Sequence, residues 1–396
     1  MSKKVYITGL GIITAIGNNI DENLENLKKG KSGIGKAQFL DSRYTDELPF
    51  GEIPYSNDAL KALANLSQDP SLTRTDTLAH IAFQQAIADA QLDHETVADA
   101  STAFISASTV GGMSMTDQLY SDGNLKGPAS PFLDAYNCGA HTHRMMEHYG
   151  MKGIATTFNT ACSSSANSIM LGVKLIRSGR AKRAIVGGTD ALAKFTVNGF
   201  NSLRILSKEP CKSFDQNRSG LTLGEGAAYL ILESEEVAET KSPYGEVLGY
   251  GNANDAYHPS SISDEATGII LAISSAIKSA KIAPGAIDYV NTHGTGTENN
   301  DSSELTGLQK IFGTIPPYQS TKPYTGHTLA AAGAIEAIFS LLSMQNSTVF
   351  PSLNITNPIS GFSHPIKDLA TKEINIALSN SFGFGGNCSS IILAKR

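Results

Sequence analysis

The sequence predicts an α/β protein in which helices and strands alternate along the chain and stack in layers. Short β-rich runs alternate with longer helical patterns from one end of the chain to the other. Some of the helical segments are apolar around most of their circumference, which predicts that they are buried between layers. The chain has 396 residues, 41% hydrophobic and 17% charged. This length indicates two domains, or one large unit with two halves.

The first elements are a strand, a helix, a second helix and a second strand. A β-rich run at residues 5–8 ends at a glycine, and the helix at 21–29 has Asp21 as its expected N-cap. A strongly apolar helical pattern covers residues 77–90. The strand at 103–106 is followed by the glycine-containing segment VGGMS, which we expect to be flexible.

The middle of the chain carries a buried helix at residues 163–178, directly after a short strand and the letters TAC. A buried strand follows at 183–187 and ends in two glycines. Strands at 227–233 and 244–251 are joined by the polar run EEVAETKS. We interpret this run as a loop and as the best candidate for a domain boundary.

The last third repeats the alternation. A helix is expected at residues 267–281, and a strand at 288–292 leads into HGTGT. An apolar helix at 329–345 begins just after a Gly-His pair, and a final strand at 377–381 precedes FGFGG. No repeat between the two halves is visible in the letters.

Composition excludes several functions. A net charge of -6 and a pI near 5.9 disfavour a nucleic-acid surface, and an acidic partner protein would need a local basic patch. The four cysteines form no C-x-x-C pair, which favours a reducing, cytoplasmic compartment. The opening residues lack a cleavage site for a signal peptide. No run of 18 apolar residues exists, so we expect no membrane insertion.

Cys162 is the candidate nucleophile. It lies between a strand and a buried helix, where the helix dipole favours an anion. A thiolate there is expected to have a depressed pKa and strong nucleophilicity. By position alone a small buried packing residue is an equal alternative.

Two histidines and a glycine-rich segment extend this hypothesis. His293 follows a strand and His327 precedes an apolar helix, and such element ends often carry functional groups. Neutral imidazoles can donate N–H bonds to a carbonyl that becomes an enolate. The segment SFGFGG sets aromatic rings between glycines, so its backbone can approach a ligand while Phe384 covers it. Each feature alone is more often structural.

Together these segments resemble the β-ketoacyl-acyl-carrier-protein synthases of the thiolase superfamily, of the elongating I/II type. The resemblance rests on TAC, THGTGT, K-x-x-x-GH and SFGFGG in that order, with weaker similarity at ITGLGIIT, SPF, GEGAA and DAYH. It spans almost the whole chain. It implies a thiolase-like fold with two related halves in α-β-α-β-α layers. Residues 1–240 would form the half with the nucleophile, and residues 241–396 the half with both histidines.

The resemblance implies a decarboxylating condensation of an acyl-enzyme with malonyl-carrier protein. Cys162 would accept the acyl group, and His293 and His327 would complete the triad. Lys322 would control the electrostatics of the site. The backbone N–H groups of Cys162 and Phe384 would form the oxyanion hole, and the Phe384 ring a gate.

Further expectations concern the substrate and partners. Thr295 and Thr297 would bind the phosphopantetheine arm, which arrives on the acyl-carrier protein, and Val110 would line the acyl pocket near a dimer interface. No cofactor would be required for the chemistry. The chain would form a homodimer, or a heterodimer with a sister synthase.

Some relatives hold a buried monovalent cation, Na⁺ or K⁺. The matching positions here are Asn291, Glu304, Glu336, Ser379 and Asn380. Carboxylates and carbonyls suit a hard ion, and Glu336 in an apolar helix needs a partner if buried. An ordinary hydrogen-bond network is the alternative.

Departures from the family pattern leave the triad intact but bear on the substrate. Three serines at 163–165, Asn387 with Cys388 after FGFGG, and Ala330 with Ala331 replace the usual residues. The run TACSSS is more familiar in polyketide-type synthases. These changes suggest a specialised branch that builds polyenes or polyketide-like chains.

Three alternatives remain open. A thiolase would use a second cysteine as base, for which Cys388 is badly placed after FGFGG. An initiating synthase would have Cys-His-Asn, whereas both later positions are His here. An inactive chain-length partner of a heterodimer would usually lack Cys162.

Other motifs have simpler interpretations. His141, His143 and His148 are expected on a helix surface or at a subunit contact rather than in a metal site. The run at Gly9 lacks the third glycine of a dinucleotide fingerprint. Cys138, Cys211 and Cys388 are expected to be packing residues.

Overall fold

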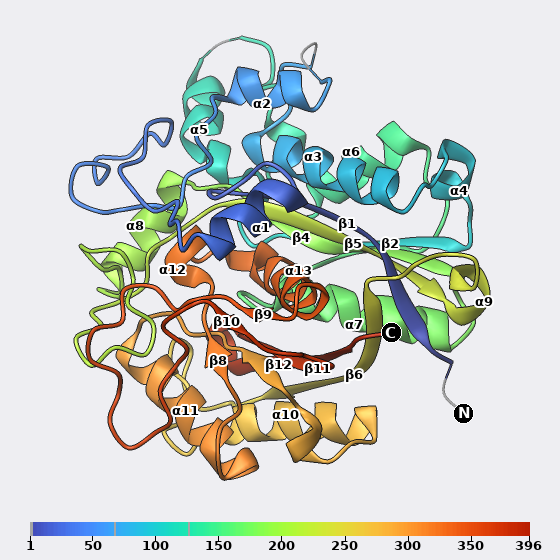
Figure 1. The fold of residues 1–396 in the computed structure, drawn as a ribbon. Coiled ribbons are helices and arrows are strands. Elements are labelled where there is room, and N and C mark those ends of the chain that lie inside the picture. The colour runs from blue at the N-terminus through green and yellow to red at the C-terminus, as the bar shows by residue number, and fades with distance from the viewer. Residues whose placement is uncertain (1–2, 67–68, 126) are drawn as a thin grey trace.

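The computed structural model describes residues 3–66, 69–125 and 127–396. Figure 1 shows helices above, between and below two layers of strands. Helices α3 and α6 cover one outer face, α7 and α13 lie in the middle, and α10 and α11 cover the other outer face. The predicted α-β-α-β-α layering is therefore confirmed.

The strands repeat one topology twice. The first half contains β1 (Val5–Thr14), β2 (Thr102–Ala107), β3 (Ala155–Phe158), β4 (Arg183–Asp190) and β5 (Gly226–Ser234). The second contains β6 (Gly245–Asn254), β7 (Tyr289–Asn291), β8 (Tyr318–Gln319), β11 (Ile376–Phe382) and β12 (Asn387–Ala394). A separate antiparallel pair is formed by β9 (Thr348–Val349) and β10 (Ala370–Thr371).

Within the described residues the order along the main sheet is β3-β2-β4-β5-β1-β6-β12-β11-β7-β8. The strands of each half are numbered here in chain order. From the central pair β1 and β6 outward, both halves then have the order first, fifth, fourth, second and third strand. In each half the first two neighbouring pairs are antiparallel and the last two are parallel. The two halves are thus related, although the letters show no repeat.

Small residues repeat this relationship at the packing level. In β1, a Cβ on Gly11 would lie 1.9 Å from the carbonyl oxygen of Ala82 in α3. In β6, a Cβ on Gly251 would lie 2.0 Å from the carbonyl oxygen of Ala272 in α10. Each helix lies so close to its strand that only glycine fits.

The helices of the first half are α1 (Ile20–Lys28), α2 (Asn57–Leu63), α3 (Arg74–Asp89), α4 (His94–Ala98), α5 (Thr116–Asn124), α6 (Ala140–Tyr149), α7 (Ser164–Arg177), α8 (Lys194–Ser202) and α9 (Glu235–Ala238). Those of the second half are α10 (Thr267–Ala280), α11 (Glu298–Phe312), α12 (Lys322–Thr325) and α13 (Ala332–Gln345). As predicted, α7 and α13 are buried on most sides.

Several local predictions need correction. Asn19, not Asp21, caps α1, because its side chain accepts the N–H of Glu22. Strand β4 continues through its two glycines to Asp190. The polar run after β5 is not all loop, since α9 lies within it.

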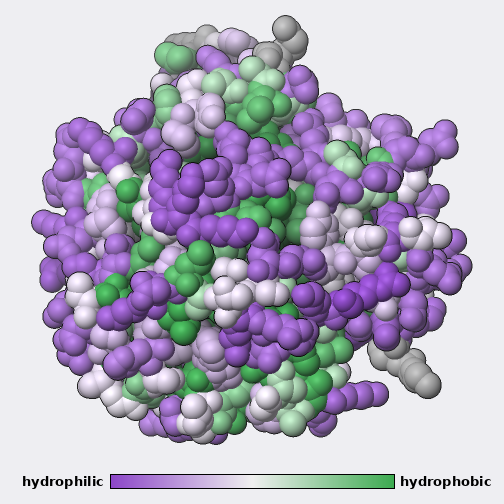
Figure 2. Space-filling view, in the orientation of Figure 1, coloured by the Kyte–Doolittle hydropathy of each residue, from purple (hydrophilic) through white to green (hydrophobic). Residues whose placement is uncertain are grey.

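The face in Figure 2 is mostly hydrophilic, with hydrophobic side chains in small separate patches. Within the described ranges, no helix is both long and apolar enough to cross a bilayer.

Candidate active site

The turn between β3 and α7 presents Cys162. Ala161, one residue earlier, has a φ of +51°, a left-handed conformation that is strained for a residue with a side chain. This sharp turn places Cys162 next to the N-terminus of α7, and only 5% of the residue is exposed.

Three predicted residues converge here. The sulfur of Cys162 and one ring nitrogen each of His293 and His327 all lie within 4.8 Å of one another. The two imidazole rings meet edge to face at a centroid distance of 5.4 Å. All three side chains are buried. Residues from the two halves of the chain, up to 165 positions apart, therefore form one cluster.

The hydrogen bonds of His327 define its tautomer. Nδ1 accepts the backbone N–H of Leu329 over 3.1 Å, so we assign the ring proton to Nε2. Within the described residues Nε2 has no hydrogen-bond partner, although it is buried. Burial, followed by the charge of Lys322, holds the pKa of His327 well below its usual value. The ring is neutral and presents an unpaired N–H donor.

His293 is oriented by Lys322. The Lys322 ammonium lies 3.2 Å from Nδ1 of His293 and also donates to the His293 carbonyl oxygen. An ammonium can only donate, so Nδ1 is the acceptor and Nε2 carries the proton. Glu336 pairs with the same ammonium, which gives both buried charges a partner. Burial, then Lys322 and His327, holds the pKa of His293 well below its usual value.

The same lysine bears on Cys162, but the expected depression of the thiol pKa is wrong. Burial raises the pKa of the Cys162 thiol to about 11, and the positive charge of Lys322 offsets only part of the increase. Hydrogen bonding from the backbone N–H groups of Phe384 and Cys162 also lowers the pKa. The resting residue is a thiol at neutral pH.

Phe384 lies at the tip of a short loop that follows β11. Its half-buried ring stacks on Phe200 of α8 at a centroid distance of 5.6 Å. Together with Cys162, its backbone N–H frames one side of the sulfur, which is where an oxyanion hole is expected.

A cavity of about 520 Å³ connects this cluster with the surface. Its lining includes Cys162, both histidines, Phe384, Thr295 and Thr297. The hydroxyls of the two threonines lie 2.9 Å apart. Sequence reasoning missed many other lining residues, among them Phe200 and the exposed Arg204, because neither belongs to a glycine-rich or histidine motif.

Val110 lies elsewhere. It is buried in a cluster with Leu192, Val197 and Leu329. It is not one of the described residues that line the cavity. Its assignment to an acyl pocket stays a prediction.

The five predicted cation positions form one connected region. Glu304 accepts N–H groups of His293, Gly294 and Asn380. Asn291 pairs with Ser379 in the sheet, and its Nδ2 lies 3.5 Å from the Glu336 carbonyl. Burial raises the pKa of Glu304 and of Glu336 to about 7 each. Within the described residues, Oδ1 of Asn291 and Oε2 of Glu336 are buried without a partner.

The remaining cysteines and histidines lie outside the cavity lining that the structure describes. Cys388 is buried in a hydrophobic cluster on β12, and burial raises its thiol pKa to about 12. Cys211 is likewise buried, whereas Cys138 is partly exposed. His141 is buried and bonds Ser106 over 2.6 Å, so the prediction of a helix surface is wrong for this residue.

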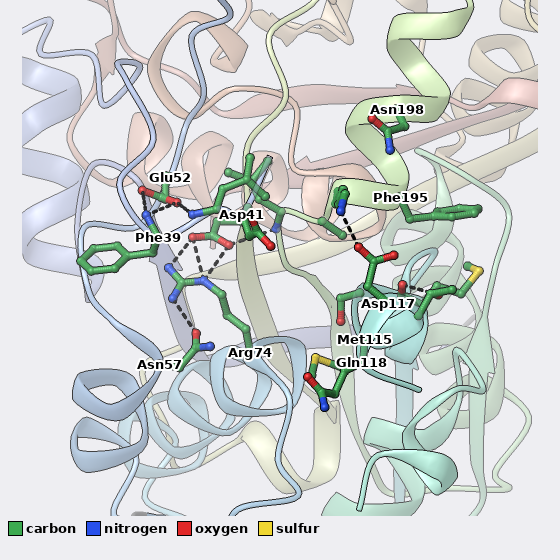
Figure 3. Close-up of a pocket in the computed structure, with 18 of the residues that line it drawn as sticks. Phe39, Asp41, Glu52, Asn57, Arg74, Met115, Asp117, Gln118, Phe195 and Asn198 are labelled. Carbon is green, nitrogen blue, oxygen red and sulfur yellow. Dashed lines mark hydrogen bonds and ion pairs between the residues drawn. The ribbon is translucent and has the colours of Figure 1, made fainter. Parts of the chain in front are cut away.

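Figure 3 shows a second cavity, of about 620 Å³, between the loop at Phe39 and α8. Arg74 points across it and forms a two-pronged ion pair with Glu225. Glu52 accepts the backbone N–H groups of three consecutive residues, Gln38 to Leu40. These polar groups are already satisfied by the protein, so this cavity offers less chemistry than the cluster at Cys162.

Comparison with known families agrees with this geometry. The model "Beta-ketoacyl synthase, N-terminal domain" matches residues 2–238, and "Beta-ketoacyl synthase, C-terminal domain" matches residues 244–356. A protein of Staphylococcus aureus (strain COL) named 3-oxoacyl-[acyl-carrier-protein] synthase 2 is 33% identical over 411 residues, with 100% of this chain and 99% of the relative covered. A protein of the same name from Coxiella burnetii is 31% identical, with 99% of each covered.

Solved structures have the same fold. "The ishigamide ketosynthase/chain length factor" superposes with a TM-score of 0.93 at 26% identity over 100% of both chains. A ketosynthase from Xenorhabdus doucetiae in complex with its chain length factor has a TM-score of 0.83 at 29% identity, over 100% of this chain and 98% of that one. The fold is thiolase-like, as the resemblance implied.

Proposed function

This chain belongs to the β-ketoacyl synthase family, and from that premise we propose that it joins an acyl group on Cys162 to a malonyl unit carried by an acyl-carrier protein. It is an acyltransferase of the 3-oxoacyl-[acyl-carrier-protein] synthase 2 type. The observation that carries the detailed assignment is the convergence of the Cys162 sulfur with two neutral histidines in one cavity.

The first step is acyl transfer. The sulfur of Cys162 attacks the thioester carbonyl, and the oxyanion accepts hydrogen bonds from the N–H groups of Cys162 and Phe384. Each donor lowers the barrier by roughly 3–4 kcal/mol. The carbon–sulfur bond to pantetheine then breaks. Because Cys162 starts as a thiol, its proton passes to the departing pantetheine sulfur, and charge is conserved.

The second step forms the new carbon–carbon bond. The malonyl carboxylate leaves as carbon dioxide, and its bonding electrons form an enolate on the thioester. Nε2–H groups of His293 and His327 stabilise the enolate oxygen. The enolate carbon attacks the acyl carbonyl on Cys162, the carbon–sulfur bond breaks, and the thiolate takes a proton from solvent. The product is a β-ketoacyl-carrier that is two carbons longer.

The carrier protein reaches the site by extending its phosphopantetheine arm through the cavity. The hydroxyls of Thr295 and Thr297 are placed along it to hydrogen-bond the amides of a phosphopantetheine arm. One neighbouring structure is titled as a polyketide acyl-carrier protein in complex with its ketosynthase, which supports a carrier as partner here. Arg204 is exposed and lines the cavity, where it supplies positive charge in an acidic chain.

The substrate we favour is a growing polyene or polyketide-type chain rather than a housekeeping fatty acid. Three serines follow Cys162. One similar solved structure is titled as a type II PKS acyl-carrier protein with its ketosynthase, and two others are titled as ketosynthases with chain length factors. The same neighbours favour a heterodimer with a sister synthase over a homodimer. We also retain the division into halves at residues 1–240 and 241–396.

The cation site belongs to this proposal. The unpaired buried oxygens of Asn291 and Glu336 fit a monovalent cation. With Glu304, Ser379 and Asn380, they would hold an ion that neutralises buried carboxylates and stiffens the His293 strand end. The bond changes described above need no metal or redox cofactor.

Two measurements test the function. Mixed with acyl-carrier, the wild-type protein should gain the acyl mass on Cys162, and Cys162→Ala should not while keeping its melting temperature. Malonyl-carrier should release carbon dioxide, which a non-decarboxylating thiolase would not produce. An adduct on Cys162→Ala would contradict the nucleophile, and a wild type that forms no adduct would support the inactive-partner alternative.

A further inference from the structure

Two residues in which this chain departs from the family pattern contact each other. Ser163 directly follows Cys162, and Asn387 directly follows FGFGG, 224 positions later. Oγ of Ser163 donates to Oδ1 of Asn387 over 2.7 Å. Ser163 is completely buried, so its hydroxyl must find its hydrogen-bond partner within the protein.

The orientation of the Asn387 amide follows from its neighbours. Nδ2 of Asn167 and Nδ2 of Asn252 both donate to Oδ1 of Asn387, over 3.0 Å and 2.9 Å. If the Asn387 amide were flipped, its NH₂ group would face the NH₂ groups of Asn167 and Asn252, and none of the three could accept. Oδ1 of Asn387 is therefore the atom that faces Ser163.

Asn387 also closes the loop that carries Phe384. The residues from Gly383 to Asn387 form this gate loop, and its base is joined by the Gly383 N–H, which donates to the Asn387 carbonyl oxygen over 2.8 Å. Gly385 and Gly386 have φ values of +81° and +83°, which glycine adopts without strain. Asn387 thus binds the base of the gate loop through its main chain and Ser163 through its side chain.

The gate loop lies directly against the turn that bears the nucleophile. A Cβ on Gly383 would lie 2.6 Å from the carbonyl oxygen of Thr160 and 3.2 Å from the nitrogen of Cys162. The single hydroxyl proton of Ser163 is shared between Asn387 Oδ1 and the Thr160 carbonyl oxygen, which also lies 2.7 Å from Oγ. A small displacement of the loop would therefore change the distance between the Phe384 N–H and the Cys162 sulfur.

We propose that Ser163 and Asn387 are positioning residues that hold the gate loop in register with Cys162. Their hydrogen bond keeps the Phe384 N–H aimed at the oxyanion that forms during acyl transfer. The inference rests on the proposed function. It predicts a selective effect on acyl transfer, because His293 and His327 are oriented by other contacts, from Lys322 and Leu329.

Ser163→Ala should lower the single-turnover rate of Cys162 acylation about tenfold, since displaced oxyanion donors lose part of their effect. Carbon dioxide release from malonyl-carrier, measured without an acyl donor, should stay within about twofold of wild type. Ser168→Ala is the matched control. It removes a different buried hydroxyl, on α7, that bonds the carbonyl oxygens of Ser106 and Ser164 instead of the gate loop. We expect its acylation rate to be that of wild type.

Asn387→Ala and the double variant Ser163→Ala/Asn387→Ala complete a mutant cycle. The double variant should acylate no more slowly than Asn387→Ala alone. Additive losses, an unchanged acylation rate in Ser163→Ala, or equal losses of both reactions with a lower melting temperature would overturn the inference. If the wild type itself neither acylates nor releases carbon dioxide, the proposed function fails instead, so the two failures are distinct.

Discussion

Cys162 and His327 occupy equivalent places in the two halves of the molecule. Each lies between the third strand of its half and a helix of the central layer, β3 and α7 for Cys162 and β8 and α13 for His327. The repeated topology therefore delivers one side chain from each half to the same cavity. The Cys162 sulfur and the His327 ring can meet there because the two central helices pack side by side.

His327→Asn tests the role of the Nε2 donor. The Oδ1 of asparagine can still accept the Leu329 N–H, but the Nδ2 donor of this shorter side chain then falls short of the place of Nε2. We expect carbon dioxide release from malonyl-carrier to fall by about 10²–10³-fold, with acylation of Cys162 within about threefold of wild type. Acylation is measured by mass spectrometry. A loss of acylation as large as the loss of carbon dioxide release would show that His327 serves the first step as well.

The raised pKa of Cys162 predicts an unusual pH profile. A thiol with a pKa of about 11 gains thiolate about tenfold per pH unit below that value. Alkylation by iodoacetamide should therefore rise steeply from pH 7 to pH 9 without a plateau. A depressed pKa would give a flat profile over this range, and a flat profile would contradict the dominance of burial.

Lys322 and Glu336 modulate that profile together. The charge of Lys322 lowers the Cys162 pKa more than the charge of Glu336 raises it. Lys322→Met/Glu336→Gln removes both charges and leaves neither buried alone. We expect slower alkylation at pH 8 than in wild type, with the melting temperature as a check on folding. Faster alkylation would mean that the lysine does not stabilise the thiolate.

Arg204 is predicted to serve docking of the carrier. Arg204→Glu should raise the KM for acyl-carrier about tenfold at low salt, with a smaller effect at high salt, because exposed charges are screened. The KM for a small acyl-pantetheine substrate should not change. Lys278→Glu, an exposed position on α10 away from the cavity lining, makes the same charge change and should leave both values unaltered.

Potassium or sodium chloride should raise the melting temperature at pH 8 relative to choline chloride of equal ionic strength. Glu304, whose pKa of about 7 lies below that pH, is ionised there and needs a neutralising charge, whereas Glu336 already pairs with Lys322. We expect the melting temperature to rise by roughly 1–2 °C for each 1 kcal/mol of cation-binding free energy. Asn291→Ala should remove the difference between the salts. Identical melting temperatures in the three salts would favour an ordinary hydrogen-bond network.

Much of the site was predictable because its motifs are local. The turn at Cys162, the glycines around His293 and the Gly-His pair at 327 are each visible within a few residues, and their order indicated the family. The repeat between the halves was implied by the family resemblance alone and is not visible in the letters. The repeat is reflected in pairs of small residues, such as Gly11 with Ala82 and Gly251 with Ala272. The two members of each pair come into contact only when the strand packs against its helix.

The sequence by itself determined the fold class, the family and the identity of the three clustered side chains, because these depend on residue types in short, ordered segments. Only the tertiary structure decided the electrostatics of Cys162. Burial depends on everything packed around a group, and here it reversed the expected direction of the thiol pKa. Only the tertiary structure joined Ser163 to Asn387, because a contact across 224 residues follows from how two strands and a helix meet and not from either segment alone.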